Sequence, residues 1–462
     1  MQNIQTSKYF SFLKFEYFGY GLLYLFSFYL YDLILFPTLL LLLLRFGKAP
    51  SILDLPLIFM VIDIKSLFVS SIFAPDIITT IVTNLFLLRI VFYQIRSGIK
   101  IGNWLQYLLL AAIVFWGVIP FLLNDVMDWH AYYSQAKLLI VLLFIFIGFG
   151  HIKPSEHEVE CVVSFFLGVL TAFAFFAVQS TGNTFYISLD STKALIVLPS
   201  LYFIFKQKHL LAILVLAVTF YVLIYFSTRY IILIYVPIIV AAVIYYRAYK
   251  IALPALAGLS IFSLGDVQHI TFSRIQSLGR IFTMDIFSYD GFYETLRRSD
   301  PTRAAEFYYF IEQMNVWRAI FGRGFGAHLE NTQGLVNETT IGTSSYSYDE
   351  IISNYIFNVH DPILEFTLAY GLVVVIMWLL FLVVVFWRGL VTRNIFLGFY
   401  PLAFLTMYWS TKGMLVIGIM TCVVMAQMGS RRFKNRQMTR PHAGSLATSS
   451  LRTSGSRNPG AG

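Results

Sequence analysis

Long apolar stretches recur along most of this chain and constrain its fold more than any other feature. A helix rises 1.5 Å per residue, so about 20 apolar residues cross the ~30 Å hydrocarbon core of a bilayer. Of the 462 residues, 58% are hydrophobic and 12% charged, which excludes a water-soluble globule with an ordinary charged surface. We therefore predict an all-α polytopic membrane protein with about 14 transmembrane helices, in a range of 12 to 14. The predicted spans are 15–30, 31–45, 51–72, 76–95, 104–123, 136–150, 160–180, 192–206, 209–226, 229–246, 250–265, 362–387, 394–410 and 413–428.

Lysine and arginine gather in every second connection between these spans. Cytoplasmic loops carry an excess of both residues, so this side is predicted to be cytoplasmic and to hold both termini. The opposite connections are acidic or neutral, as at 124–135, which contains Asp125 and Asp128. The cations on the predicted cytoplasmic side are Lys8, Lys14, Arg45, Lys48, Arg96, Lys100, Lys153, Lys206, Lys208, Arg247, Lys250, Arg388, Arg393, Arg431, Arg432, Lys434 and Arg436.

One long connection, residues 266–361, has no apolar run of span length and is predicted to be a large external loop. It contains twelve Asp and Glu, seven Arg and no Lys, a net charge of −5. Arg suits bidentate binding of phosphate oxygens, although each Arg could equally pair with a local carboxylate. The chain thus divides into 1–265 with eleven spans, the loop, 362–428 with three spans, and a disordered basic cytoplasmic tail at 429–462.

Within the loop, residues 303–321 have apolar side chains at helical spacing, which predicts an amphipathic helix near the membrane surface. The Gly-rich stretch 322–326 follows and is predicted to end this helix. The apolar side of the helix is predicted to contain Phe307, Phe310, Ile311, Met314 and Trp317.

Charged residues at the external ends of spans are candidates for the functional site, because ionisable groups at membrane depth are costly. Arg229, Lys137 and Lys193 are in such positions. His360 lies where the loop re-enters the membrane and could accept a proton while Asp361 or a backbone carbonyl orients it. Alternatively, His360 and Asp361 only cap the helix that Pro362 opens.

Three of these candidates come from separate segments but are predicted to lie on the same external face. Arg229 and Arg303 would provide positive charge, which suits a departing diphosphate, and His360 would provide a base for an attacking sugar hydroxyl.

Several common motifs are absent from the whole sequence. It has no Asp-x-Asp pair, Walker A loop, zinc-type His and Cys spacing or Gly-x-Ser-x-Gly elbow. No metal site and no cofactor are therefore predicted. An external site also has no ready access to cytosolic nucleotide donors, so we expect a donor already carried across the membrane on a lipid.

Short sequence pieces between about 215 and 375 resemble the O-antigen ligase-like membrane proteins, which include Wzy-type polymerases and WaaL-type ligases. These pieces agree with the family in order and spacing. In the family Asn often follows the His, whereas this chain has Asp361. The matching pieces are Ser227-Thr228-Arg229, Arg303 ahead of Trp317-Arg318, Phe321-Gly322-Arg323-Gly324-Phe325-Gly326, and His360-Asp361-Pro362-Ile363-Leu364-Glu365 followed by Tyr370-Gly371.

The resemblance implies a metal-independent, inverting glycosyltransferase of the bacterial inner membrane whose active site faces the periplasm. Arg229 and Arg303 would bind the diphosphate of an undecaprenyl-diphosphate-linked oligosaccharide, and His360 would assist the acceptor hydroxyl. The expected partners are this donor, membrane lipid and a chain-length regulator protein, with no nucleic acid. Residues expected to help bind substrate are Arg318, Arg323, Lys193, Lys137 and Glu365.

Three functions remain open at this point. The first is a polysaccharide polymerase that moves a growing glycan onto a new lipid-linked repeat unit in lipopolysaccharide biosynthesis. The second is a ligase that moves the glycan onto lipid A-core. A third, of another class, is a lipid-linked glycan transporter or flippase, which would be expected to have internal repeats and charges along a central path. The sequence has no convincing repeat.

Overall fold

The structure, a computed structural model, describes most of the predicted helices and part of the loop. The span predicted at 250–265 and the tail at 429–462 lie outside the described residues. The described residues are 13–23, 40, 42–46, 48–62, 75–98, 104–122, 129–149, 154–179, 195–226, 229–246, five between 291 and 297, 301–334, 354–356, 359, 362–406 and 416–427.

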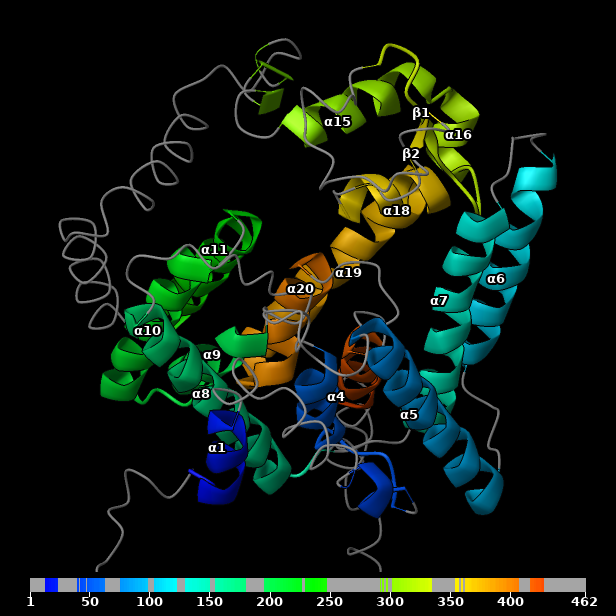
Figure 1. The fold of residues 1–462 in the computed structure, drawn as a ribbon. Helices are drawn as coiled ribbons and strands as arrows, with labels where there is room; N and C mark the ends of the chain where they lie inside the picture. Colours follow the sequence, from blue (N-terminus) through cyan, green and yellow to red (C-terminus); the bar gives the residue numbers. More distant parts are fainter. Residues whose placement is uncertain are drawn as a thin grey trace, which may run out of the picture.

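The described part of the chain is all-α apart from one short strand pair, and several helices are strongly apolar (Figure 1). Two of them, Glu156–Phe175 within α8 and Leu372–Thr392, are long and apolar enough to cross a membrane by length and composition. The elements are α1 (Phe15–Leu22), α4 (Asp54–Ile62), α5 (Pro75–Ser97), α6 (Trp104–Leu122), α7 (Trp129–Phe149), α8 (Glu156–Gln179), α9 (Leu198–Phe205), α10 (His209–Phe226), α11 (Arg229–Tyr245), α15 (Pro301–Gln313), α16 (Val316–Phe321), β1 (Leu329–Glu330), β2 (Tyr355–Ile356), α18 (Pro362–Tyr370), α19 (Leu372–Thr392) and α20 (Ile395–Thr406), with a further helix at Val416–Gln427.

α8 packs against α1 at a crossing of two glycines. A Cβ atom added to Gly21 or to Gly168 would collide with the backbone of the opposite helix, so the two backbones are in direct contact. Lys14, just before α1, also forms an ion pair of 3.0 Å with Glu160. Small residues at a crossing allow this close approach between apolar helices. Residues of α8 belong to the buried core, and Tyr17 of α1 packs against it.

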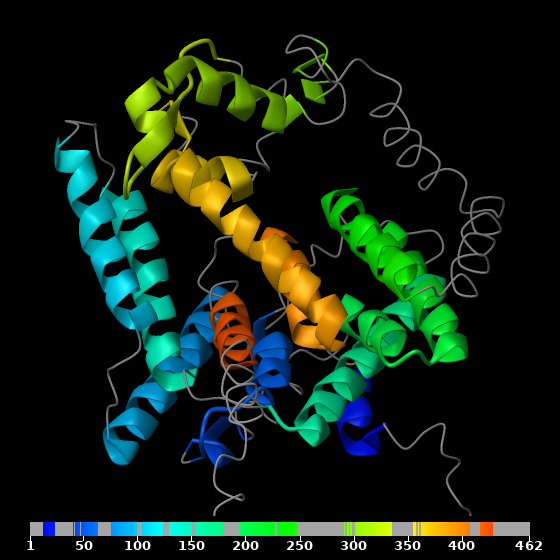
Figure 2. The same cartoon turned by 180° about the vertical axis from the view of Figure 1, so that it is seen from behind.

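α19 and α20 form a hairpin that fixes the direction of α11. Gly389 and Gly398 pack backbone to backbone within the hairpin. The hydroxyl of Tyr246, just after α11, donates a hydrogen bond of 2.6 Å to the carbonyl oxygen of Leu390 near the end of α19. Both views show α11 and α19 running in similar directions (Figures 1 and 2). Arg229, the first residue of α11, therefore lies toward the end of the bundle where α19 begins.

The structure divides two segments that the sequence predicts as continuous helices, so both predictions are wrong. The span 362–387 breaks at Gly371, whose φ of +87° separates α18 from α19. The amphipathic helix 303–321 becomes α15 and α16, because Asn315 leaves the helical conformation and its side chain accepts the backbone N–H of Arg318. In both places local backbone geometry overrides the apolar periodicity.

The apolar side predicted for 303–321 is only partly correct. Phe310 and Met314 pack against the core, but Ile311 is 47% exposed and Trp317 is 67% exposed. The break at Asn315 separates α16 from α15, so the stripe does not continue to Trp317, whereas Ile311 precedes the break and is exposed on α15 itself. The buried residues of α15 are instead Thr302, Ala304, Ala305, Glu306 and Tyr309.

A buried ion cluster that the sequence analysis did not predict connects α4 and α5. The side chains of Arg89 and Asp54 are fully buried, and Arg89 Nη1 lies 3.0 Å from Asp54 Oδ1. Arg45 Nε lies 2.9 Å from the same oxygen. Arg89 Nε also donates to the carbonyl oxygen of Arg45 at 2.7 Å. The cluster joins the segment before α4 to the middle of α5.

Asp54→Ala is expected to destabilise the fold by about 3–5 kcal/mol, because it leaves the buried charge of Arg89 without its carboxylate. Thermal unfolding of the purified protein in detergent measures the effect. Glu156→Ala is the matched control: Glu156 pairs with Lys206 on an exposed part of the surface, so its removal is expected to change the unfolding temperature little. Equal effects of the two variants would contradict a special role for the buried cluster.

Candidate functional site

The Gly-rich turn after α16 is joined to the end of α18 by backbone hydrogen bonds. The N–H of Arg323 donates to the carbonyl oxygen of Leu368 at 2.8 Å, and the N–H of Gly324 donates to that of Ala369 at 3.0 Å. These two carbonyls belong to the last turn of α18, where helix geometry leaves carbonyls without intrahelical partners. The turn thus supplies hydrogen-bond donors to carbonyls of the last turn of α18.

The same turn is also joined to α6 and α7. The N–H of Phe325 donates to the carbonyl oxygen of Trp116 at 3.1 Å, and the indole N–H of Trp116 donates to that of Phe321 at 3.1 Å. The N–H of Gly326 donates to Gln135 Oε1 at 2.8 Å. The turn is therefore held between α18 and two helices far from it in the sequence, α6 and α7.

Glycine is required where the turn meets the break between α18 and α19. Gly322 and Gly371 have φ values of +76° and +87°, which L side chains rarely adopt. A Cβ at Gly322 would collide with the carbonyl of Ala369 and the nitrogen of Gly371, and a Cβ at Gly371 would collide with the carbonyl of Ile320. The two backbones therefore approach as closely as their atoms permit. We call this contact the glycine clamp.

A short strand pair joins the chain after the Gly-rich turn to the chain before α18. β1 pairs antiparallel with β2, with Leu329 opposite Ile356. His328, immediately before β1, is buried with its ring 4.7 Å from that of Tyr355. Arg323 Nη1 donates to the carbonyl oxygen of His328 at 2.6 Å, so the side chain of Arg323 helps to hold the turn.

α15 lies against α18 and β1 and contains Arg303. Arg303 is half-buried, whereas Glu306, one turn later, is fully buried. Arg318, in α16, is half-buried. Two predicted substrate-binding cations, Arg318 and Arg323, therefore lie on the segment that the glycine clamp joins to α18.

Glu365 lies in the first turn of α18, outside the candidate span that begins at Leu372. Desolvation by burial, followed by the negative charge of Glu306, raises the pKa of Glu365 to about 8. By exposed surface the residue is half-buried, so the shift is moderated by whatever solvent reaches the carboxyl. Burial thus favours the protonated form of this carboxyl, which can donate a hydrogen bond.

The remaining predicted site residues fall in different parts of the chain. Lys137 lies in the third turn of α7, half-buried, and not at the helix end that the sequence suggested, because α7 begins earlier, at Trp129. Arg229 begins α11. Lys193 and His360 lie outside the described residues. His360 immediately follows Val359, which is buried.

Sequence reasoning missed three buried polar residues of this region: Gln135, Glu306 and His328. Gln135 ends a predicted acidic connection, and its local sequence gives no sign that its side chain accepts a hydrogen bond from a turn 191 residues away. Glu306 and His328 could have been found as ionisable residues near a predicted Arg and a Gly-rich turn. Within the described ranges, no group of three His, Cys, Asp or Glu could hold a metal ion.

No protein-family model matches this chain, and neither a curated protein nor a solved structure is detectably similar to it.

Gly322→Ala is expected to detach the turn from α18, because the added Cβ collides with backbone atoms that cannot move independently. The expected result is faster proteolytic cleavage of the loop in the purified protein. Gly334→Ala is the matched control: its φ of +64° is also in the left-handed region, but nothing lies within 4 Å of the added Cβ. Equal cleavage rates in the two variants would attribute the effect to backbone strain alone.

The pKa of Glu365 predicts a defined dependence of stability on pH. Its folded pKa lies above its ordinary value of 4.5, so between about pH 4.5 and pH 8 the folded state binds more protons than the unfolded state. Stability therefore falls as pH rises through this window. Glu365→Gln should reduce this fall in the unfolding temperature. Glu312→Gln, on the exposed side of α15, should leave the pH dependence as in the parent protein.

Proposed function

We propose that this chain is a polytopic inner-membrane glycosyltransferase that polymerises lipid-linked glycan repeat units at the external face. It would transfer the growing glycan from undecaprenyl diphosphate to the terminal sugar of a new lipid-linked unit. The finer membrane topology, with about 14 spans and both termini in the cytoplasm, is part of the proposal.

The composition and the described helices support a membrane location. The sequence is 58% hydrophobic. Two described helices satisfy the length and hydropathy of a membrane span, and shorter apolar helices of 10–17 residues accompany them. The alternation of Lys and Arg between connections supports the proposed orientation.

The packing of the glycine clamp is the observation that carries the proposed activity. The Gly-rich turn and the segment after His360 are separate pieces of the family-like pattern, and the turn bonds directly to Leu368 and Ala369 of α18. α15, with Arg303, lies against the same helix. The Gly-rich turn and the helix that contains Arg303 thus pack against the same helix, α18, which supports the proposal that these loop pieces act together.

The proposed reaction is a direct displacement. The acceptor hydroxyl oxygen attacks the anomeric carbon while His360 takes its proton, and the bond to the diphosphate breaks with its electron pair remaining on the leaving oxygen. Arg229 and Arg303 would stabilise the growing negative charge of the diphosphate. No metal ion or cofactor is required for this balance of charge and protons.

Arg303→Ala, Arg229→Ala and His360→Ala are each expected to lower polymer formation by about a hundredfold or more, the scale for removing a base or a charge stabiliser. The assay incubates the purified protein with a lipid-linked repeat unit and follows the ladder of longer glycans. Arg297→Ala is the control, because Arg297 is an exposed loop cation that pairs with Glu294. Near-normal product from His360→Ala would remove the base assignment.

The same assay separates the three functions. A ladder that forms without lipid A-core identifies a polymerase. Transfer only when lipid A-core is added identifies a ligase and sinks the polymerase proposal. Movement of the lipid-linked glycan across a proteoliposome membrane without any transfer identifies a transporter.

A further inference from the structure

A proline inside α6 opens that helix at the point where the Gly-rich turn meets it. Pro120 has no N–H, so the carbonyl oxygen of Trp116, four residues earlier, loses its usual donor within the helix. The N–H of Phe325 donates to this oxygen at 3.1 Å. A hydrogen bond from a distant segment thus takes the place of one that α6 cannot make.

Two glycines let the turn enter this opening. A Cβ at Gly324 would collide with the ring of Pro120 and with the carbonyl oxygen of Trp116, so the backbone of the turn lies directly on the proline. A Cβ at Gly117 would lie 3.7 Å from Cε2 of Phe325, so the ring of Phe325 packs beside this glycine. Phe325 is itself 1% exposed. We call the opening formed by Trp116, Gly117 and Pro120 the proline socket.

The socket holds both ends of the Gly-rich turn. The carbonyl of Trp116 accepts from Phe325, and the indole N–H of Trp116 donates to the carbonyl oxygen of Phe321, directly before the turn, at 3.1 Å. α7 closes the socket, because the hydroxyl of Tyr132 donates to the carbonyl oxygen of Gly117 at 3.0 Å. The ring of Tyr132 also packs edge to face against that of Phe325, at 5.7 Å. Backbone, indole and aromatic contacts therefore fix the turn at one place on α6.

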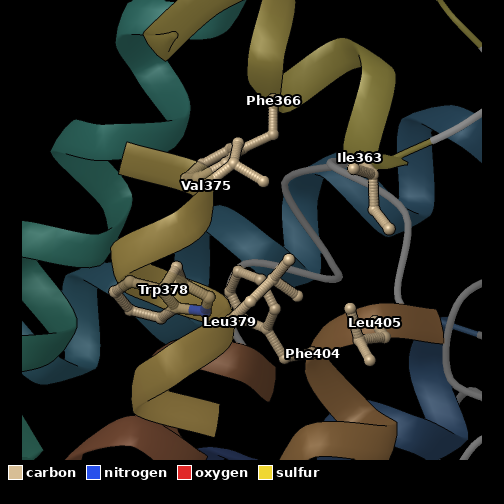
Figure 3. Close-up of a pocket in the computed structure, with 7 residues that line it drawn as sticks. All are labelled: Ile363, Phe366, Val375, Trp378, Leu379, Phe404 and Leu405. Carbon is tan, nitrogen blue, oxygen red and sulfur yellow. The ribbon is translucent and has the colours of Figure 1, made fainter. Parts of the chain in front are cut away.

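Aromatic packing continues from the socket through α18 to α20. The ring of Tyr370, at the end of α18, lies 5.2 Å from that of Trp116 and 4.7 Å from that of Phe366. Phe366 packs against Phe404 of α20 beside a space of only about 20 Å³ with an apolar lining (Figure 3). Side chains packed this closely leave little room for one element to move without its neighbours. A shift of the turn in the socket would therefore be transmitted to α18.

The turn is joined to both elements that flank His360 in the sequence. α18 begins at Pro362, and its last carbonyls accept from the N–H groups of the turn. β2 ends at Ile356 and pairs with β1, which follows the turn. The position of the turn in the socket therefore bears on both elements that flank the predicted base.

We propose that Pro120 and Trp116 are positioning residues for the glycan transfer, because they hold the Gly-rich turn that is joined to the elements flanking His360. Both belong to α6, far in the sequence from the pieces that resemble the ligase-like family. The inference rests on the proposed function and extends it, because it gives the first half of the chain a part in the reaction.

Pro120→Ala tests the socket, because the new N–H can donate to the carbonyl of Trp116 within α6 and compete with Phe325. Amide hydrogen exchange of residues 322–327 in the purified full chain, followed by mass spectrometry, measures how firmly the turn is held. Exchange should become about fivefold faster, the scale of one net hydrogen bond. The kcat of polymer formation should fall about tenfold while KM for the lipid-linked unit changes less than about twofold, because position is lost and substrate contacts are not.

Lactic acid incorporated at position 120 is the matched control, because it has the side chain of alanine without the N–H. It should leave the exchange of residues 322–327 and the kcat close to those of the parent protein. Unchanged exchange in Pro120→Ala, or equal acceleration by alanine and lactic acid, would overturn the socket.

Trp116→Phe tests the second contact, because it removes the N–H that bonds to Phe321 but keeps a ring beside Tyr370. It should also speed exchange and lower kcat, with an unfolding temperature close to that of the parent, which separates positioning from general destabilisation. Trp129→Phe, at an exposed position of α7, should change none of these.

The two kinds of readout distinguish failure of this inference from failure of the proposed function. Faster exchange with an unchanged kcat in both Pro120→Ala and Trp116→Phe would overturn the positioning role and leave the proposed reaction standing. A parent protein without any transfer would refute the proposed function and the positioning role with it, whereas the exchange rates would still decide whether the socket holds the turn.

Discussion

Direct backbone contact at the glycine clamp is the constraint on which the arrangement of the loop depends. Gly322 and Gly371 both have positive φ values, and neither position has room for a Cβ. The contact lets N–H groups of the turn donate hydrogen bonds to the carbonyls at the end of α18. Further N–H groups of the turn donate to α6 and α7. A side chain at either glycine would separate these surfaces, and the hydrogen bonds between them would lose their geometry.

The charged residues near the clamp lie in different environments. The side chain of Arg323 is buried, and its Nη1 donates to the carbonyl oxygen of His328 within the same turn. Arg303 lies on α15, outside the turn. On α18, desolvation by burial and then the nearby Glu306 raise the pKa of the Glu365 carboxyl to about 8.

At the other end of the molecule, buried polar contacts fix the helices that support this unit. The Arg89–Asp54 pair connects α4 and α5, and Tyr246 ties the end of α11 to the end of α19. Because an uncompensated charge in an apolar interior is costly, such contacts have few alternative partners and specify one arrangement.

The sequence by itself determined the positions of most helices, because runs of apolar residues bounded by turns and charges have few other stable forms. The predicted span 209–226 coincides with α10, and 104–123 with α6 to within one residue. Only the tertiary structure decided the helix break at Gly371 and the burial of Glu306. Both depend on what a distant segment places beside a residue, and apolar periodicity contains no information about distant neighbours. His360, the predicted base, belongs to neither group, because it lies outside the described residues.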